Sequence, residues 1–102
     1  MEEVKINGLT DGVLSIALSG DIDLANAEAF YQAVSKAYQN NPADIEFDCT
    51  TLNFIDSTTL GTFVKILKAV KLDGHTMKLI HLQPKIKKLF LICSLDSIMQ
   101  IQ

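Results

Sequence analysis

Apolar and polar residues alternate over the first twenty positions in the way that two short β-strands require. The first strand, residues 4–6, is followed by an Asn-Gly pair at 7–8 and an Asp-Gly pair at 11–12, both of which favour tight turns. The second strand covers residues 13–19. An antiparallel hairpin is therefore expected to open the fold.

Helical spacing replaces this alternation over residues 24–39, where apolar side chains recur every three or four positions. Asp23 is placed to cap this helix, and the Asn-Asn-Pro sequence at 40–42 would end it. The alternating strand that follows is expected to end near Asp48, and the apolar pair Phe54-Ile55 beyond it is expected to be buried.

A second amphipathic helix is predicted at 58–72, ended by an Asp-Gly pair at 73–74. A strand at 77–82, a short helix from Pro84 and a closing strand at 98–101 follow. Because a strand–helix–strand crossover is right-handed and returns the chain in the same direction, the later strands should be parallel. We predict one α/β domain, 1–102, with a mixed, mostly parallel sheet of about five strands, the first antiparallel, and three to four helices.

Composition narrows the classes of function. With 102 residues there is no room for a separate catalytic domain, and a net charge of −3 argues against a nucleic-acid-binding protein. The acidic N-terminus lacks a signal core, and no apolar run approaches the roughly 18 residues that a membrane span needs. We expect a cytoplasmic protein without direct membrane insertion.

Cys49 and Cys93 are isolated and are expected to be reduced core thiols rather than metal ligands.

The carboxyl ends of the strands are where open α/β sheets place their functional groups. Here those ends carry residues 20–23, Asp48 and residues 54–57. Ser57 would begin the second helix. Its hydroxyl could serve simply as an N-cap, worth about 1 kcal/mol, so its position alone does not establish a function.

Four motifs extend this interpretation. The sequence at 56–61, Asp-Ser-Thr-Thr-Leu-Gly, resembles the Asp-Ser-Ser/Thr-Gly-Leu-Gly motif of the STAS family of anti-sigma factor antagonists. Residues 20–23 are similar to the family's Gly-Glu-Leu-Asp, and residues 73–74 and 84–90 match its later Asp-Gly turn and Pro-initiated helix. The resemblance follows the family's order over nearly the whole chain.

The resemblance implies a regulatory protein without enzymatic activity or cofactor. Its unphosphorylated form would bind an anti-sigma factor serine kinase and free the sigma factor. Phosphorylation of Ser57 would end binding, and a phosphatase would restore it. We expect a monomer or weak dimer. The partner-binding residues that it implies are Asp21, Asp23, Asp56, Ser57, Thr58, Thr59, Gly61 and Thr62.

Three departures from the family pattern bear on this expectation. Thr59 stands where the family usually has glycine and could narrow the approach of a kinase to Ser57. Ser94 also replaces a usual glycine, and the sequence ends at Gln102 without the final helix of many members. A STAS-like regulatory subunit of a membrane transport complex, such as a lipid ABC transporter, or of a signalling complex without phospho-switching therefore stays an alternative.

Other chemistries are weakly supported. Carboxylates at strand ends could bind Mg²⁺ as in a receiver domain, but the lysine that receivers need after the last strand is absent from 98–102. No glycine-rich phosphate loop is present. His75 and His81 have no nucleophile beside them in the sequence and are expected at the surface or a strand edge, and Ser57 lacks a Gly-x-Ser-x-Gly elbow. We predict no catalytic residue and no metal site.

Overall fold

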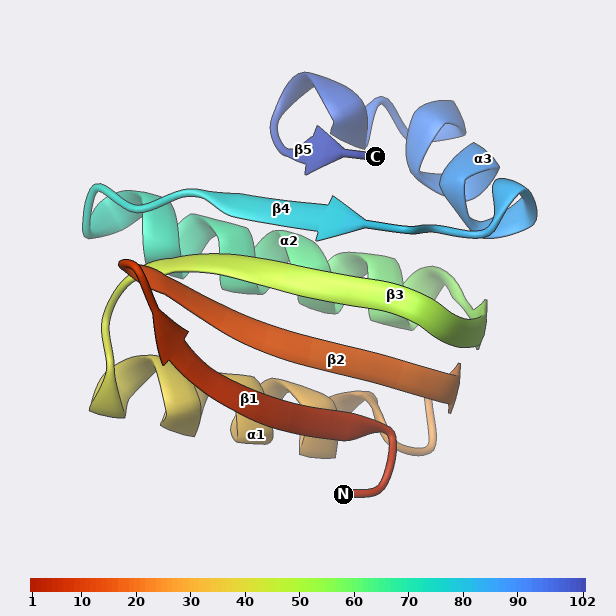
Figure 1. Cartoon of the computed structure of the whole chain (residues 1–102). Helices are drawn as coiled ribbons and strands as arrows, with labels where there is room; N and C mark the ends of the chain where they lie inside the picture. Colours follow the sequence, from red (N-terminus) through yellow and green to blue (C-terminus); the bar gives the residue numbers. More distant parts are fainter.

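Five strands form one sheet in which the spatial order follows the chain, β1-β2-β3-β4-β5 (Figure 1). The computed structural model describes all of residues 1–102. Only β1 and β2 are antiparallel, so the predicted α/β fold class is confirmed. The elements are β1 (Val4–Thr10), β2 (Val13–Ile22), α1 (Ala27–Asn40), β3 (Asp44–Ile55), α2 (Ser57–Leu72), β4 (Met77–Ile80), α3 (Pro84–Ile92), the 3₁₀ helix η1 (Leu95–Ser97) and β5 (Gln100–Ile101).

The turn of the β1–β2 hairpin uses Asp11 and Gly12, whose φ angles are 53° and 79°. Two consecutive residues with positive φ form the tight turn whose twist suits antiparallel strands. The other predicted turn, at residues 7–8, instead lies inside β1, where the register against β2 shifts between Ile6 and Gly8. A bulge therefore replaces that turn, and β1 is longer than predicted.

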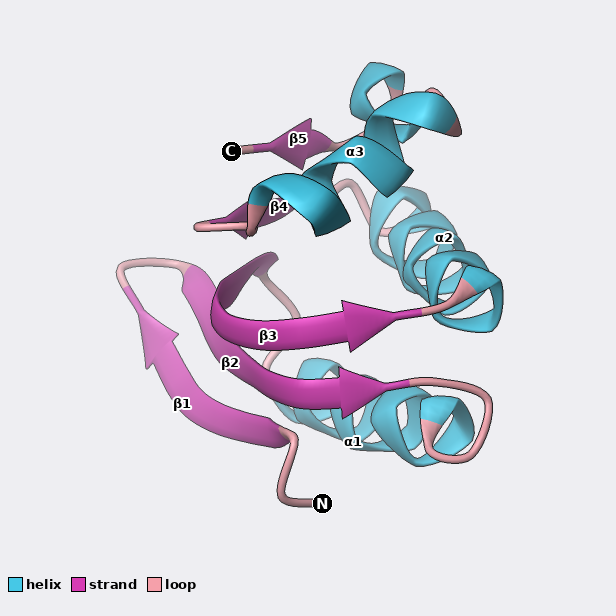
Figure 2. Cartoon of the chain, turned by 90° about the vertical axis from the view of Figure 1, so that its right-hand side faces the viewer, coloured by secondary structure: helices cyan, strands magenta, loops and turns pink.

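The core lies between the sheet and the helices α1 and α2, which run side by side against one face (Figures 1 and 2). Contacting ring centroids of four fully buried phenylalanines are 5.1–6.1 Å apart, in edge-to-face geometry. One ring comes from each of α1, β3, α2 and α3: Phe30, Phe47, Phe63 and Phe90. All three helices are thereby joined to the centre of the sheet.

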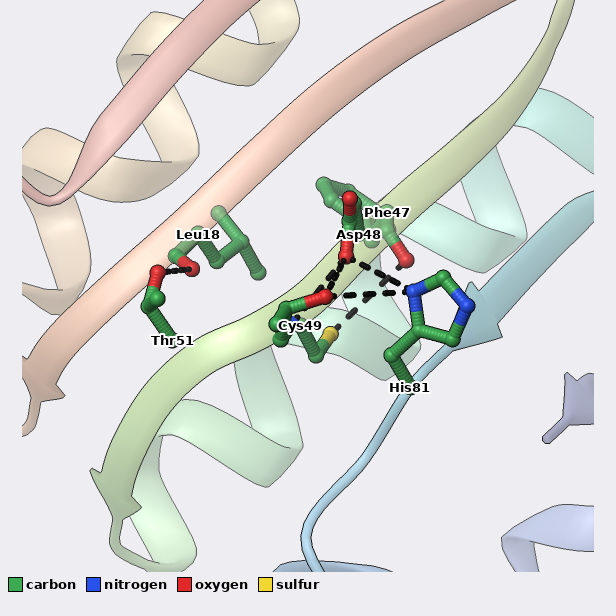
Figure 3. A network of polar contacts seen from close by, with 7 residues as sticks. Leu18, Phe47, Asp48, Cys49, Thr51 and His81 are labelled. Carbon is green, nitrogen blue, oxygen red and sulfur yellow. Dashed lines mark hydrogen bonds and ion pairs between the residues drawn. The ribbon is translucent and has the colours of Figure 1, made fainter.

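β3 does not end near Asp48, as predicted, but continues to Ile55. Register shifts between Ala17 and Ser19 and between Gly20 and Asp21 of β2 bend the two strands while they stay paired. Asp48 therefore lies within the strand, where its Oδ1 is 3.1 Å from Nδ1 of His81 (Figure 3). Alternation of burial continues through Cys49 and Thr50 and is lost from Thr51 onward.

Two side chains that were predicted to be buried or capping behave differently. Phe54 was expected to be buried with Ile55 as an apolar pair, but it is 47% exposed, whereas Ile55 is buried. Asp23 does not cap α1, which begins only at Ala27 after Asn26. The Asp23 carboxylate instead accepts a hydrogen bond from the Ala25 N–H, at 3.0 Å, inside a tight loop. Local turn formation has replaced the first predicted turn of the helix.

The two cysteines differ from each other. Cys49 is a fully buried core thiol, and burial raises its pKa to about 12. Cys93 is exposed, so its predicted place in the core is wrong. Cys93 ends α3, and the next residue, Ser94, has a φ angle of 58°. That left-handed conformation explains why glycine is usual at this position.

β4 and β5 are both shorter than their predicted ranges. The left-handed φ of 61° at His81 ends β4 after Ile80, since strand geometry cannot continue through it. The residues before β5 form η1, which leaves Gln100 and Ile101 as the only strand residues there. β4 and β5 nevertheless pair in parallel, as predicted.

Candidate functional site

The carboxyl ends of β2 and β3 lie at the same end of the sheet, where the chain enters α1 and α2 (Figure 1). Ile22 and Ile55, the last residues of the two strands, are paired. The loop after β2 is therefore adjacent to the start of α2, and residues separated by more than thirty positions meet there.

Asp56 joins these two segments through both of its carboxylate oxygens. As the N-cap of α2, it accepts a hydrogen bond from the Thr59 N–H at 3.0 Å, and its second oxygen accepts one from the Leu24 N–H at 2.9 Å. The Thr59 N–H, followed by the Leu24 N–H, holds the pKa of Asp56 below its ordinary value. Asp56 is thus ionised at neutral pH and fixes the loop against the helix.

Ser57 is the first residue of α2 and is exposed. The side-chain cap of α2 is supplied by Asp56, so the capping role that Ser57 could have had is not its role. The Ser57 hydroxyl forms no hydrogen bond within the protein and is accessible to a reagent or partner at the positive end of a helix.

Thr59 differs from the other residues predicted to contact a partner, because its side chain is fully buried. Its hydroxyl donates a hydrogen bond to the Ile22 carbonyl and lies 3.1 Å from Oδ1 of Asp56. The side chain points inward, away from Ser57, so it does not narrow the approach to that hydroxyl. Thr59 instead ties the end of β2 to the first turn of α2.

The outer face of the first two turns of α2 is made of small side chains. Ser57 and Gly61 are one turn apart, as are Thr58 and Thr62. The Thr62 hydroxyl donates to the Thr58 carbonyl at 3.1 Å, which directs it back onto the helix. The side chains on this face are therefore short, which leaves room for another protein to approach the helix backbone closely.

Two further carboxylates stand at the same end of the sheet. Asp21 is exposed and accepts a long hydrogen bond of 3.4 Å from Nδ2 of Asn53. Asp23 is half-buried in the loop described above. We use the term Ser57 surface for Asp21, Asp23, Asp56, Ser57, Thr58, Gly61 and Thr62, a set whose formal charge is negative.

The structure adds two apolar residues that the sequence did not single out. Leu24 is 75% exposed, and its backbone N–H is held by Asp56. Phe54 is paired with Asp21 across β2 and β3. Helical periodicity placed Leu24 in a helix, and Phe54 was expected in the core as part of an apolar pair, so only the extended loop and the bend of β3 reveal their exposure.

No group of three or more His, Cys, Asp or Glu side chains is arranged to hold a metal ion. No helix is both long and apolar enough to span a membrane. His75 contacts Tyr38 in an edge-to-face arrangement with ring centroids 5.9 Å apart, and His81 contacts Asp48, so both histidines have partners other than the Ser57 hydroxyl.

Known proteins resemble this chain in both sequence and fold. The family model for the STAS domain matches residues 7–102. The anti-sigma-B factor antagonist of Bacillus subtilis is 30% identical over 88 residues, covering 86% of this chain and 80% of that protein. The crystal structure of an anti-sigma factor antagonist from Mycobacterium paratuberculosis has a TM-score of 0.81 at 21% identity, over 96% of this chain and 82% of that one.

The anti-sigma factor antagonist SpoIIAA of Bacillus has the same fold in both of its forms. The unphosphorylated form gives a TM-score of 0.76 at 19% identity, over 97% of this chain and 86% of that one. The phosphorylated form gives 0.75 at 21% identity, over 97% and 90%. The family match over residues 7–102, together with the 30% identity to the B. subtilis protein, shows that this chain belongs to the STAS domain family.

Proposed function

We propose that the protein is a cytoplasmic anti-sigma factor antagonist whose binding is controlled by phosphorylation of Ser57. In its unphosphorylated form it binds an anti-sigma factor serine kinase and so frees the sigma factor. The kinase phosphorylates Ser57 and thereby ends binding, and a phosphatase restores the active form. The names of the sequence relatives support antagonism of an anti-sigma factor.

The observation that carries the proposal is the state of the Ser57 hydroxyl. It is exposed at the start of α2 and unbonded, because Asp56 supplies the cap. A kinase can reach it without unfolding the helix or breaking a native hydrogen bond. A serine that served as the cap would lose that bond on phosphorylation, whereas this one has none to lose.

A phosphate at Ser57 would change binding much more than folding. It would add a charge of about −1.5 to −2, and the helix N-terminus would stabilise that charge by up to ~1 kcal/mol. The same charge would be repelled by the carboxylates of the Ser57 surface and would have to lose its water when a partner covers it. The fold should therefore persist while the complex does not form.

The proposal is tested with the cognate anti-sigma factor kinase and ATP. Mass spectrometry should show one phosphate on the wild type and on Thr58→Ala, which removes the neighbouring exposed hydroxyl, and none on Ser57→Ala. Unphosphorylated Ser57→Ala should bind the kinase with wild-type affinity, whereas Ser57→Asp should bind several-fold or more weakly. Equal affinities of the Ala and Asp variants, with unchanged circular dichroism, would refute the switch.

A further inference from the structure

A shallow groove separates α3 from the end of β3. Its volume is about 190 Å³, of the same order as the roughly 150 Å³ that accommodates a benzene molecule. One aromatic or branched aliphatic side chain would fill it. Its lining is mainly apolar and consists of Asn53, Phe54 and Ile55 from β3 and Lys85, Ile86 and Leu89 from α3. We call it the α3 groove.

Charge distinguishes the α3 groove from the Ser57 surface. The α3 sequence contains Lys85, Lys87 and Lys88 and no acidic residue. None of these lysines forms an ion pair within the protein. Lys85 lines the groove, and Lys88 is exposed one turn further along. An occupant that carries acidic residues beside an apolar side chain would complement both the charge and the lining of the groove.

The apolar side of α3 extends beyond the groove itself. Leu89 is 36% exposed and Ile92, three positions later, is 68% exposed. Ile86 and Phe90, by contrast, are buried against the core. The outer stripe is therefore additional to the apolar face that folding uses, and covering it would remove apolar area from water.

The α3 groove is continuous with the Ser57 surface along the chain. Ile55 lines the groove, Asp56 follows it, and Ser57 begins the next helix. α3 lies at the same end of the sheet as the carboxyl ends of β2 and β3 (Figure 1). A protein that covers Ser57 from this end can therefore reach the groove with a neighbouring segment.

We propose that the α3 groove is a docking site for an apolar side chain in an acidic segment of the anti-sigma factor kinase. The inference rests on the proposed function, since that function supplies the partner. The kinase would hold Ser57 in its active site and α3 through a separate contact. Because this contact does not involve the reacting hydroxyl, it stabilises the bound substrate and the transition state equally.

Equal stabilisation of those two states gives the proposal a kinetic signature. Loss of the contact should raise KM for phosphorylation of Ser57 and leave kcat unchanged. A variant that merely misplaced the Ser57 hydroxyl would lower kcat instead. The two effects are measured in the same assay.

The experiment determines KM and kcat of the cognate kinase for Lys85→Glu and Leu89→Glu. We expect KM to rise at least five-fold for each, with kcat within two-fold of the wild type. Lys68→Glu and Leu72→Glu are matched controls, because both residues are exposed on α2 outside the groove and Leu72 is 88% exposed. Both controls should leave KM within two-fold. Lys85→Glu keeps the test valid if Leu89→Glu fails to fold.

The outcomes separate the two proposals. Unchanged KM for both groove variants, with normal phosphorylation of Ser57, would overturn the docking site and leave the switch intact. A wild type that its kinase does not phosphorylate would overturn both. Sedimentation of the wild type alone tests a second copy of this chain as the occupant, and a dimer that Leu89→Glu dissociates, with unchanged KM, would assign the groove to self-association.

Discussion

The two ends of α2 each carry an aspartate, and the two are used differently. At the N-terminal end, Asp56 accepts hydrogen bonds from the Leu24 and Thr59 N–H groups and contacts the Thr59 hydroxyl at 3.1 Å, and the neighbouring Ser57 hydroxyl is left free. At the C-terminal end, Asp73 accepts a hydrogen bond of 2.8 Å from the Tyr38 hydroxyl. At the first end Asp56 binds mainly backbone groups and Ser57 stays exposed, whereas at the second end the side chains of Tyr38 and Asp73 pair with each other.

The C-terminal end of α2 is closed by several linked contacts. The ring of His75 packs edge-to-face on Tyr38, and its Nδ1 is 3.6 Å from Oδ1 of Asp44. The same oxygen of Asp44 accepts the Thr76 N–H at 2.9 Å. These contacts join α1, the loop after α2 and the start of β3. The contrast shows that linked side-chain contacts close one end of the sheet, whereas at the other end the Ser57 hydroxyl is left without a bond; the latter end is the one we propose for recognition of a partner.

The largest loss of stability is expected from removing the core contacts of Phe63, because both ends of α2 depend on them. Phe63, at the middle of α2, contacts Phe30, Phe47 and Phe90. Phe63→Ala should lower the free energy of unfolding by about 3–5 kcal/mol, because it leaves a cavity in the core. Denaturant titration measures this loss. Thr62→Ala, next to Phe63 in sequence but on the outer face of α2 and only half-buried, should cost about 0.5 kcal/mol or less.

In Phe63→Ala, the backbone amides at both ends of α2 should lose protection from hydrogen exchange, and the two ends should then exchange at similar rates. Hydrogen exchange followed by mass spectrometry would show this as faster exchange at the first and last turns of α2 alike. Faster exchange at only one end would mean that the two ends unfold separately and that Phe63 does not couple them.

Asp56→Ala should disturb the N-terminal end of α2 and leave its C-terminal end unchanged. It removes the cap of α2 and the bond to Leu24, and we expect Tm to fall by roughly 5–10 °C. Binding to the anti-sigma factor kinase should weaken several-fold, because the loop that carries Leu24 is no longer held. Asp56→Asn keeps acceptor oxygen but no charge, and it should lie between the wild type and Asp56→Ala.

The pH dependence gives this prediction a sign. The pKa of Asp56 is lowered in the folded state, so its stabilising contribution is present above the ordinary carboxyl pKa of about 3.9 and is lost as the pH falls through the lower folded value. The difference in Tm between the wild type and Asp56→Asn should therefore shrink below about pH 4. Asp48, whose pKa is lowered first by its hydrogen bond to Thr50, keeps its own acid dependence in both proteins.

The smallest loss of stability is expected from Tyr38→Phe, which acts at the C-terminal end of α2. Loss of the hydrogen bond to Asp73 should cost about 0.5–1 kcal/mol without changing kinase binding. Burial, and then Asp73, raises the pKa of Tyr38 to about 12, so its contribution is complete below about pH 10 and is lost as the pH rises through 12. Tyr31→Phe is the control, since the Tyr31 hydroxyl forms no hydrogen bond and its ring instead contacts Lys65. Weaker kinase binding by Tyr38→Phe would contradict the separation of the two ends.

Sequence patterns predicted the elements better than their ends. The interior of α2 was predictable because its apolar period is long and regular, and its Asp-Gly stop gives Gly74 a φ angle of 82°. The end of β3 was not predictable, because the bulged pairing with β2 and not the residue pattern decides where alternation ceases. The same bend exposes Phe54, which a local reading of an apolar pair places in the core.

The candidate site was predictable only in part for a related reason. The Asp-Ser pair at the start of α2 is a local signal, and it correctly located a helix N-terminus. Whether the aspartate or the serine caps the helix depends on side-chain geometry, and the inward direction of Thr59 depends on the position of the Ile22 carbonyl. The α3 groove could not be predicted at all, since it lies between segments that are thirty positions apart.

The sequence by itself determined the α/β order of the elements, the family and the position of one serine at a helix start, because periodicity, turn residues and short motifs act over a few neighbouring residues. Only the tertiary structure decided which hydroxyl is free, which apolar residues face the solvent and how Asp56 joins two distant segments. Those properties depend on packing and hydrogen bonding between residues far apart in the chain, which no local pattern records.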